Sequence, residues 1–170
     1  MKAFFSLCTF VMLALHQTQG CPWMQDKFPQ YSRTYLTLLE EMGEKITEES
    51  VGVNFPDELY RLARKSQPER IIKFIAQVLD EVSLLLDEDL NVVAWDQKKL
   101  KDFMSTLDTQ LVATQSCVNK TKGNKRLHLY FRKLRSETLQ MEDKAQAWEL
   151  IRKEVHRHLT KVDLLASTRL

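Results

Sequence analysis

Residues 146–154 read QAWELIRKE and open the last helical pattern of the chain. Apolar residues recur there at steps of three and four, and the stripe that they form consists of Trp148, Ile151, Val155, Leu159, Val162 and Leu165. This period places the whole stripe on one face of an α-helix. The sequence therefore predicts a helix that begins near Lys144 and buries its Trp148 face.

The same period occurs in four earlier segments, and no stretch alternates for long enough to suggest a strand. The segments are residues 31–43, residues 67–87, residues 95–116 and the stretch that follows Gly123-Asn124. Gly43 is expected to stop the first helix, and Ser66, three residues before Glu69, is expected to cap the second. Amphipathic helices in one domain bury their stripes against each other, so the predicted fold class is an all-α bundle of about five main helices.

The connection between the first two main helices is long, covers residues 44–66 and contains Phe55-Pro56. A long first connection allows consecutive helices to run parallel, as in up-up-down-down cytokine bundles. Within it, residues 57–65 are expected to form a short helical turn with Leu59 and Leu62 facing inward. The sequence thus favours a helical cytokine bundle with a long first crossover connection.

The first twenty residues have the pattern of a secretory signal peptide. Lys2 supplies a positive start, residues 3–15 are almost wholly apolar, and Thr18 and Gly20 are the small residues of a cleavage site. The apolar run is too short to span a bilayer, so no membrane insertion is expected. We therefore expect removal of residues 1–20, secretion of the protein to the extracellular space, and a single domain at residues 21–170.

Removal of this segment takes away Cys8 and leaves Cys21 and Cys117. In an oxidising compartment, an even pair of cysteines normally forms a disulfide. Two free thiols, or a bridge between two molecules, are the alternative. The favoured pairing would tie the N-terminus of the mature chain to its middle.

Charge is nearly balanced in the mature chain, which has 24 basic and 23 acidic side chains once Lys2 is gone. This balance argues against nucleic acid or membrane as a dedicated partner. Locally, residues 37–58 hold seven acidic residues and one lysine, whereas residues 120–135 hold seven basic residues and no acidic one. Each segment is either a solvated surface or a docking surface.

Asn119-Lys120-Thr121 is an N-glycosylation sequon in the polar loop after Cys117. The neighbouring basic residues are Lys120, Lys122, Lys125 and Arg126. They could hold a sulfated glycosaminoglycan weakly, or they could simply keep the loop and the fourth helix soluble. Asn119 is therefore a predicted glycosylation site, and the polysaccharide contact is an open alternative.

Residues that would support catalysis or metal binding are scarce. His128, His156 and His158 lack the spacings of a bundle di-iron site or a zinc protease, and no glycine-rich phosphate loop is present. Glu154 and His158 lie one helical turn apart and are expected to form an exposed pair rather than a metal site. The sequence thus predicts no enzyme, no cofactor and no metal.

Several separated features together resemble the type I interferons, most closely the two-cysteine group of fish type I interferons. The features are Cys21 at the start of the mature chain, Phe55-Pro56 near the end of the long connection, Trp95-Asp96 at the head of the third helix, Cys117 at its end, and the 146–154 segment. The resemblance covers essentially the whole mature length. It implies a secreted antiviral cytokine that brings together two class II cytokine receptor chains and triggers JAK-STAT signalling, with no chemistry of its own.

In the family that the chain resembles, the first connection and the last helix contact one receptor chain, and the opposite side of the bundle contacts the other. The positions implied here are Arg152, Lys153, His156 and Arg157 on the last helix, and Glu48, Glu49 and Val51 in the first connection. The last-helix residues are expected on one face, away from the Trp148 stripe. Their charge would complement an acidic receptor patch.

Two departures from the family pattern limit this transfer. Mammalian members join the first connection to the last helix with a second disulfide, whereas this chain has Ile46 and Gln146 at the corresponding positions, and it has Ser50 near their basic contact residue. The last helix is therefore expected to be held by packing, with Trp148 in the core, and a receptor contact is the lesser reading of that residue. A monomer is expected. The alternatives for the whole chain are another secreted helical cytokine with different receptors, or a secreted helical bundle that binds lipid or membrane.

Overall fold

The computed structural model describes residues 21–87, residue 90, residues 93–119 and residues 122–170. The predicted signal segment, residues 1–20, lies outside the described residues. The described helices are α2 (Pro22–Asp26), α3 (Phe28–Glu41), α4 (Asp57–Arg64), α5 (Pro68–Leu86), α6 (Gln97–Ser116), α7 (Lys125–Leu139) and α8 (Lys144–Arg169). No strand occurs within this part of the chain, so the all-α prediction is confirmed.

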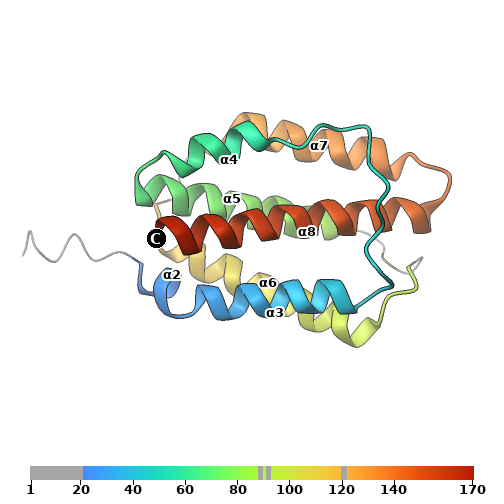
Figure 1. Ribbon diagram of the computed structural model, residues 1–170, viewed down its shortest axis with the longest axis horizontal. Helices are drawn as coiled ribbons and strands as arrows, with labels where there is room; N and C mark the ends of the chain where they lie inside the picture. The colour runs from blue at the N-terminus through green and yellow to red at the C-terminus, as the bar shows by residue number, and fades with distance from the viewer. Residues whose placement is uncertain (1–20, 88–89, 91–92, 120–121) are drawn as a thin grey trace, which may run out of the picture.

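The long helices form an up-up-down-down bundle. α3 and α5 run in one direction, and α6 and α8 return in the other (Figure 1). Each member of the first pair packs against both members of the second, so the neighbouring helices are antiparallel. α7 is added beside α5 and α8, and α4 lies inside the first connection and packs on the same two helices.

Local sequence explains where most of these helices begin. α6, α7 and α8 begin after Asp96, Asn124 and Asp143, and each of these side chains accepts a hydrogen bond from a backbone amide of the first turn. α5 begins differently, because Gln67 occupies its cap position without a side-chain cap and the Ser66 hydroxyl donates to the Leu62 carbonyl at 3.1 Å. The prediction that Ser66 caps this helix is therefore wrong.

The predicted stripes meet in one core, with two corrections at its margin. α4 is a full two-turn helix whose Leu59, Tyr60 and Ala63 are buried, but Leu62 is 46% exposed, so its predicted inward position is wrong. The first main helix begins at Phe28, three residues earlier than predicted, and the Phe28 side chain is completely buried. Proline at the next position suits a first helical turn, a signal that the apolar period does not include.

A disulfide joins Cys21 to Cys117, with 5.4 Å between the two Cα atoms, as the cysteine count predicted. It ties the residue before α2 to the end of α6. The Trp23 indole of α2 also donates to the Gln110 side chain of α6 at 3.0 Å. The N-terminal turn is thus attached to α6 by one covalent bond and one polar contact.

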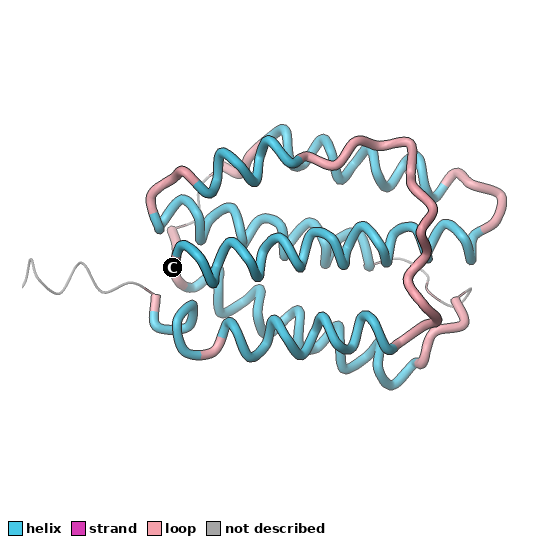
Figure 2. The backbone as a smooth tube through the Cα atoms, viewed as in Figure 1, coloured by secondary structure: helices cyan, strands magenta, loops and turns pink. Residues whose placement is uncertain are grey.

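The residues that form the long first connection cross over α8. In Figure 2 the loop after α3 passes across the chain of α8 before it reaches α4. Hydrogen bonds between the two segments show that they are in contact. Among the described residues, no helix is long and apolar enough to cross a membrane.

Candidate functional site

The first connection and α8 form one continuous surface. We use the word crossover for residues 44–56. The Lys153 ammonium of α8 donates to the backbone carbonyl of Glu48 at 2.8 Å and also to that of Glu49. About two turns earlier, the Gln146 amide donates to the Glu49 carboxylate at 2.6 Å. The structure therefore brings together residues that the sequence assigned to one binding site from segments about a hundred positions apart.

Further along α8, the end of the crossover packs under Arg157. The guanidinium carbon of Arg157 lies 3.8 Å from the centre of the Phe55 ring, a cation–π arrangement. The same side chain is 45% exposed and approaches the Asp57 carboxylate at 3.4 Å. Lys161 lies 3.2 Å from the other oxygen of Asp57. The Phe55 ring therefore orients the Arg157 side chain, while the polar edge of the guanidinium remains open to solvent.

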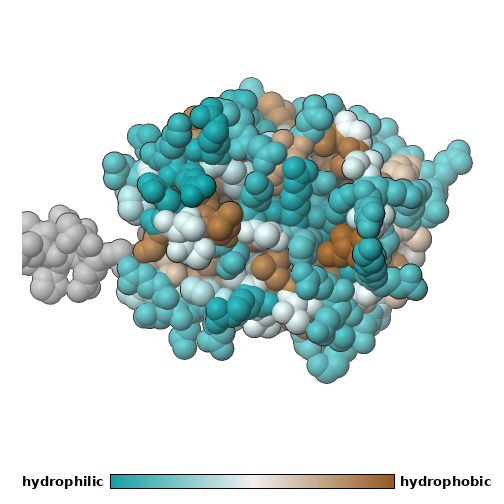
Figure 3. Space-filling view, in the orientation of Figure 1, coloured by the Kyte–Doolittle hydropathy of each residue, from teal (hydrophilic) through white to brown (hydrophobic). Residues whose placement is uncertain are grey.

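The remaining predicted contact residues lie on either side of this line. The His156 ring nitrogen Nε2 lies 2.7 Å from the Glu40 carboxylate of α3, and its side chain is 28% exposed. Glu48 and Glu49 are exposed, and Val51 is half-buried against the core. The surface therefore combines basic residues of α8 with acidic residues of the crossover. On the face drawn in Figure 3, hydrophilic residues surround separate hydrophobic areas.

Arg152 does not belong to this exposed surface, so the prediction of its position is wrong. Its side chain is completely buried. Nη1 donates to the Leu39 carbonyl at 3.0 Å, Nη2 donates to the Glu44 carbonyl at 2.5 Å, and Nη2 also donates to the Glu149 carboxylate at 2.7 Å. One guanidinium thus joins the end of α3, the start of the crossover and α8 itself.

The end of α3 explains why a buried cation is stable there. The last carbonyls of a helix lack intrahelical donors and carry the negative end of the helix dipole. Arg152 supplies donors to that end, and the Glu149 carboxylate balances its charge while accepting from the Trp95 indole at 2.5 Å. The polar groups that surround the guanidinium are therefore satisfied within the bundle.

Gly43 directly follows Met42, the cap residue of α3, so the helix ends where the sequence predicted. Its φ is not in the left-handed region, so it does not end α3 as a left-handed cap. A Cβ atom at this position would lie 3.0 Å from Cδ1 of Trp95 and 3.1 Å from Cζ of Arg152. Gly43 is needed because the chain passes close over the guanidinium.

Trp148 is only 2% exposed and packs edge-on against Trp95, with 6.3 Å between the ring centres. Its predicted place in the core is confirmed, and the reading as a receptor contact is not supported by this burial. The pair lies beside the Arg152 cluster, since Glu149 follows Trp148 directly and hydrogen bonds to the Trp95 indole.

Glu154 and His158 are both buried, so the prediction of an exposed pair is wrong. His158 Nδ1 lies 2.6 Å from the Tyr60 hydroxyl, and Glu154 accepts from the Tyr130 hydroxyl at 3.1 Å. The two residues therefore bind separate tyrosines of α4 and α7. Around His158 the aromatic rings of Phe55, Tyr60, Tyr130 and Phe131 form a tight cluster.

Burial lowers the pKa of His158 to about 3, and the nearby Arg157 charge acts in the same direction. Its Nε2 atom has no hydrogen-bond partner among the described residues. Between pH 6.5 and 3 the unfolded chain binds a proton at this residue while the folded protein does not. The free energy of unfolding therefore falls as the pH falls through that window.

We expect the double variant Tyr60→Phe, His158→Phe to be less sensitive to acid than the native protein. It removes both members of the hydrogen bond, so no buried partner is left unsatisfied. Between pH 6.5 and 4.5 the native free energy of unfolding should fall by about 2 kcal/mol more than that of the variant. Urea titrations at the two pH values measure the difference. Tyr60→Phe alone should retain the native slope, and equal slopes for all three proteins would contradict the prediction.

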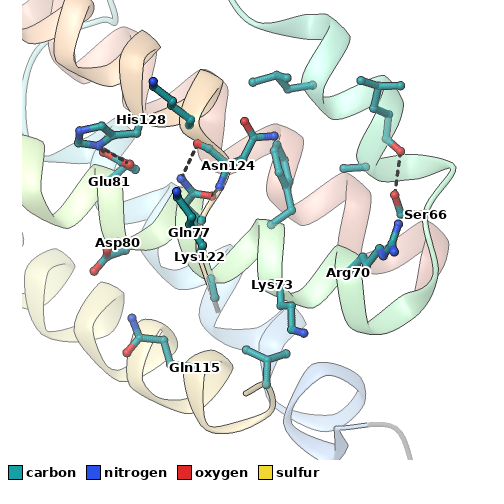
Figure 4. A pocket seen from close by; sticks show the side chains of 18 of the residues that line it. Ser66, Arg70, Lys73, Gln77, Asp80, Glu81, Gln115, Lys122, Asn124 and His128 are labelled. Carbon is teal, nitrogen blue, oxygen red and sulfur yellow. Dashed lines mark hydrogen bonds and ion pairs between the residues drawn. The ribbon is translucent and has the colours of Figure 1, made fainter. Parts of the chain in front are cut away.

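A hollow lies on another side of the bundle, between α5, α7 and the loop before α7 (Figure 4). It measures about 980 Å³, and its basic lining residues are Arg70, Lys73, Lys122 and Lys125. Acidic side chains also line it, and Glu81 lies 3.0 Å from Nδ1 of His128. The glycosaminoglycan contact stays a prediction, since the hollow is of mixed charge and Lys120 lies outside the described residues.

The rim of this hollow holds the predicted glycosylation site. Asn119 is exposed, whereas Lys120 and Thr121 of the sequon lie outside the described residues. Gln77 and Asn124 exchange two hydrogen bonds, of 3.0 Å and 2.6 Å, that attach the start of α7 to α5. Within the described part of the chain no group of acidic, histidine and cysteine side chains is arranged to hold a metal ion.

Comparisons with known proteins converge on one family. A family model described as the interferon alpha/beta domain matches residues 24–169. The chain is 38% identical to "Interferon a3" of Oncorhynchus mykiss over 164 residues, which is 94% of each protein. The solved structure of zebrafish interferon 1 is 31% identical and has a TM-score of 0.78, over 88% of this chain and all of the zebrafish chain. These matches span both α8 and the crossover.

Proposed function

The chain belongs to the interferon alpha/beta family, the type I interferons, and from this membership we propose that it signals by bringing two class II cytokine receptor chains together. As a type I interferon it is a cytokine, and members of the family bind cytokine receptors. Kinases associated with the two receptor chains would then activate STAT transcription factors. The protein contributes shape and charge to this step and carries out no reaction.

The observation that supports the proposal best is the side-by-side arrangement of the crossover and α8. In this arrangement Lys153 contacts Glu48 and Glu49, and Arg157 contacts Phe55. The same two segments carry His156 and Val51, which are both partly exposed. The receptor face, as we use the term, consists of Lys153, His156, Arg157, Glu48, Glu49 and Val51. Arg152 is left out because its side chain is buried. The second receptor chain would bind the opposite side of the bundle.

Within the receptor face, Arg157 is the residue we expect to contribute most to binding. Stacking on Phe55 limits its rotamers, so little side-chain entropy is lost when a partner binds. Arg157 and Lys161 both pair with the single carboxylate of Asp57, so two positive charges face one negative charge at this contact. An acidic patch on the receptor would complement the excess positive charge and raise both specificity and association rate.

Secretion also belongs to this proposal. Family members are secreted, and residues 1–20 of this chain would be removed as a signal peptide so that the mature protein, a single domain, begins at Cys21. The Cys21–Cys117 disulfide agrees with an oxidising compartment. We propose that the mature protein acts as a monomer, with Asn119 glycosylated and with at most weak glycosaminoglycan contact.

Charge reversal at Arg157 tests the receptor face. We expect Arg157→Glu to weaken binding to one purified receptor ectodomain by about 30-fold or more, as for other interface hot spots. The half-exposed Asp57 pair and the Phe55 stack are both lost, so the free energy of unfolding should fall by about 1–2 kcal/mol, too little to unfold the protein. Interferometry with each immobilised ectodomain gives the Kd values.

Lys101→Glu supplies the matched control, since it makes the same charge change at an exposed residue of α6. It should leave the affinity for that ectodomain within about twofold of the native value, a difference well under 1 kcal/mol. Native binding of Arg157→Glu to both ectodomains would refute the receptor face. Failure of the native protein to bind either ectodomain would refute the receptor-bridging function.

A further inference from the structure

We propose that Arg152 is a positioning residue of the receptor face: from inside the bundle it fixes the start of the crossover against α8 and so sets the affinity for the receptor chain that binds there. The inference rests on the proposed function and goes one step beyond it. Arg152 itself touches no partner, because its side chain is completely buried.

The guanidinium joins its own helix to the end of α3 and the start of the crossover, whose acceptors lie 113 and 108 residues earlier in the sequence. Its donors reach Leu39 at the end of α3, Glu44 at the start of the crossover and Glu149 on its own helix. A planar fork with five N–H groups can donate to all three at once. A lysine ammonium has a single nitrogen on a flexible stem, so it cannot reproduce this spread of acceptors.

Two other α8 side chains hold the crossover a few residues later. Lys153 donates to the Glu48 and Glu49 carbonyls, and Gln146 donates to the Glu49 side chain. We call the contacts of Gln146, Arg152 and Lys153 with residues 44–49 the crossover seam. Arg152 makes a part-buried contact at the first residue of the segment, whereas the contacts of Lys153 and Gln146 are exposed to water.

The seam keeps Glu48, Glu49 and Val51 in place before a partner arrives. A crossover that was free to move would have to be ordered during binding, and the loss of backbone entropy would oppose association. Preorganised loops avoid this loss. Release of the first one or two residues should therefore weaken receptor binding by about tenfold to a hundredfold.

Arg152→Lys is the test variant, because it keeps the positive charge beside Glu149 but loses the fork. The control is a substitution of the buried Leu107 of α6, either Leu107→Ala or Leu107→Val. The one chosen is the variant whose decrease in Tm is closer to that of Arg152→Lys. All proteins are studied as the mature chain, at a temperature at which each is fully folded by circular dichroism. Amide hydrogen exchange of residues 44–51 and the Kd for the receptor ectodomain are measured on each.

In Arg152→Lys we expect exchange in residues 44–51 to accelerate by about tenfold or more and the Kd to rise by about tenfold or more. The Leu107 variant should keep native exchange in that segment and a Kd within about twofold of native. In a variant that carries both Arg152→Lys and Arg157→Ala, the two losses of affinity should add, since Arg152 holds the start of the crossover whereas Arg157 contacts Phe55 at its end.

Each contrary result identifies what is wrong. Unchanged exchange in Arg152→Lys would show that the residue does not position the crossover. Faster exchange with an unchanged Kd would show that crossover position does not set affinity, and an equal Kd rise in the Leu107 variant would show a general effect of lost stability. All three overturn the inference while Arg157→Glu still loses binding. If Arg157→Glu binds normally, the receptor face itself fails, and the inference fails with it.

Discussion

Arg152→Ala is expected to lower the free energy of unfolding by about 3 kcal/mol, at the low end for breaking a buried ion pair, because the guanidinium is completely buried whereas its Glu149 partner is 31% exposed. Without the guanidinium, the carbonyls of Leu39 and Glu44 lose a donor, and the Glu149 carboxylate keeps only the Trp95 indole. Each buried acceptor left unsatisfied is unfavourable by itself. A cavity the size of the side chain adds to the loss.

Urea unfolding at 25 °C and pH 7, followed by circular dichroism and by tryptophan fluorescence, measures this effect. Coincident curves from the two probes would validate the two-state treatment. Lys161→Ala is the control on the same helix, because Lys161 pairs with Asp57 at 3.2 Å in a largely exposed position. It should change the free energy of unfolding by less than about 1 kcal/mol. A similar small change in Arg152→Ala would contradict the role assigned to the buried guanidinium.

Cys21→Ser, Cys117→Ser is the second variant for which we expect a large loss of stability, about 4–5 kcal/mol in the chain-entropy model. The bridge closes a loop with a sequence separation of 96 residues, and its removal enlarges the unfolded ensemble. The folded state should change little away from α2, which remains attached to α6 through the Trp23 to Gln110 hydrogen bond.

The same urea titration measures the loss, and the native protein in the presence of a reductant provides the comparison. The serine variant and the reduced native protein should both unfold at a lower urea concentration than the oxidised protein. Their m-values should be larger, because an unfolded chain without the bridge exposes more surface. Equal stability of the oxidised protein and the serine variant would show that the bridge contributes nothing to the fold. Two alkylatable thiols in the native protein would show that it does not form.

The helices could be predicted from the sequence to different extents. Helical periodicity located α5, α6, α7 and α8 to within a few residues, because their apolar stripes are continuous and Asp96, Asn124 and Asp143 mark their starts. α2 and the first turn of α3 were not predicted. Their residues are buried by the contact with α6, which no local pattern shows.

The burial of Arg152 was missed for a geometric reason. It lies four residues after Trp148 and three before Val155, so its position is part of the apolar stripe, although a charged residue usually indicates a wet face. α8 is enclosed by α3, α5, α7 and the crossover, and it therefore buries far more than one face. Its buried residues are Ala147, Trp148, Leu150, Ile151, Arg152, Glu154, Val155, His158, Leu159, Val162, Leu165 and Ala166.

Contacts to backbone carbonyls were the other feature beyond sequence reasoning. The acceptors of Arg152 and Lys153 in the crossover are main-chain oxygens, and any residue type presents the same group. The close approach of Gly43 to Trp95 and Arg152 could not be predicted either, because those residues are distant from it in the sequence. Gly43 has no left-handed φ, so its conformation does not require glycine. The close packing that it allows can be recognised only when the position of α8 is known.

Footprinting of lysine side chains tests the central claim, which is that the crossover and α8 together bind one receptor chain. The mature protein is labelled with an amine-reactive reagent, alone and with each saturating ectodomain, and the rate at each lysine is read by mass spectrometry. For one ectodomain we predict slower labelling at Lys45, Lys153 and Lys161, which lie on the crossover and α8, and unchanged labelling at Lys122 and Lys125. Saturation with either ectodomain that left Lys45, Lys153 and Lys161 as reactive as in the free protein would contradict the account.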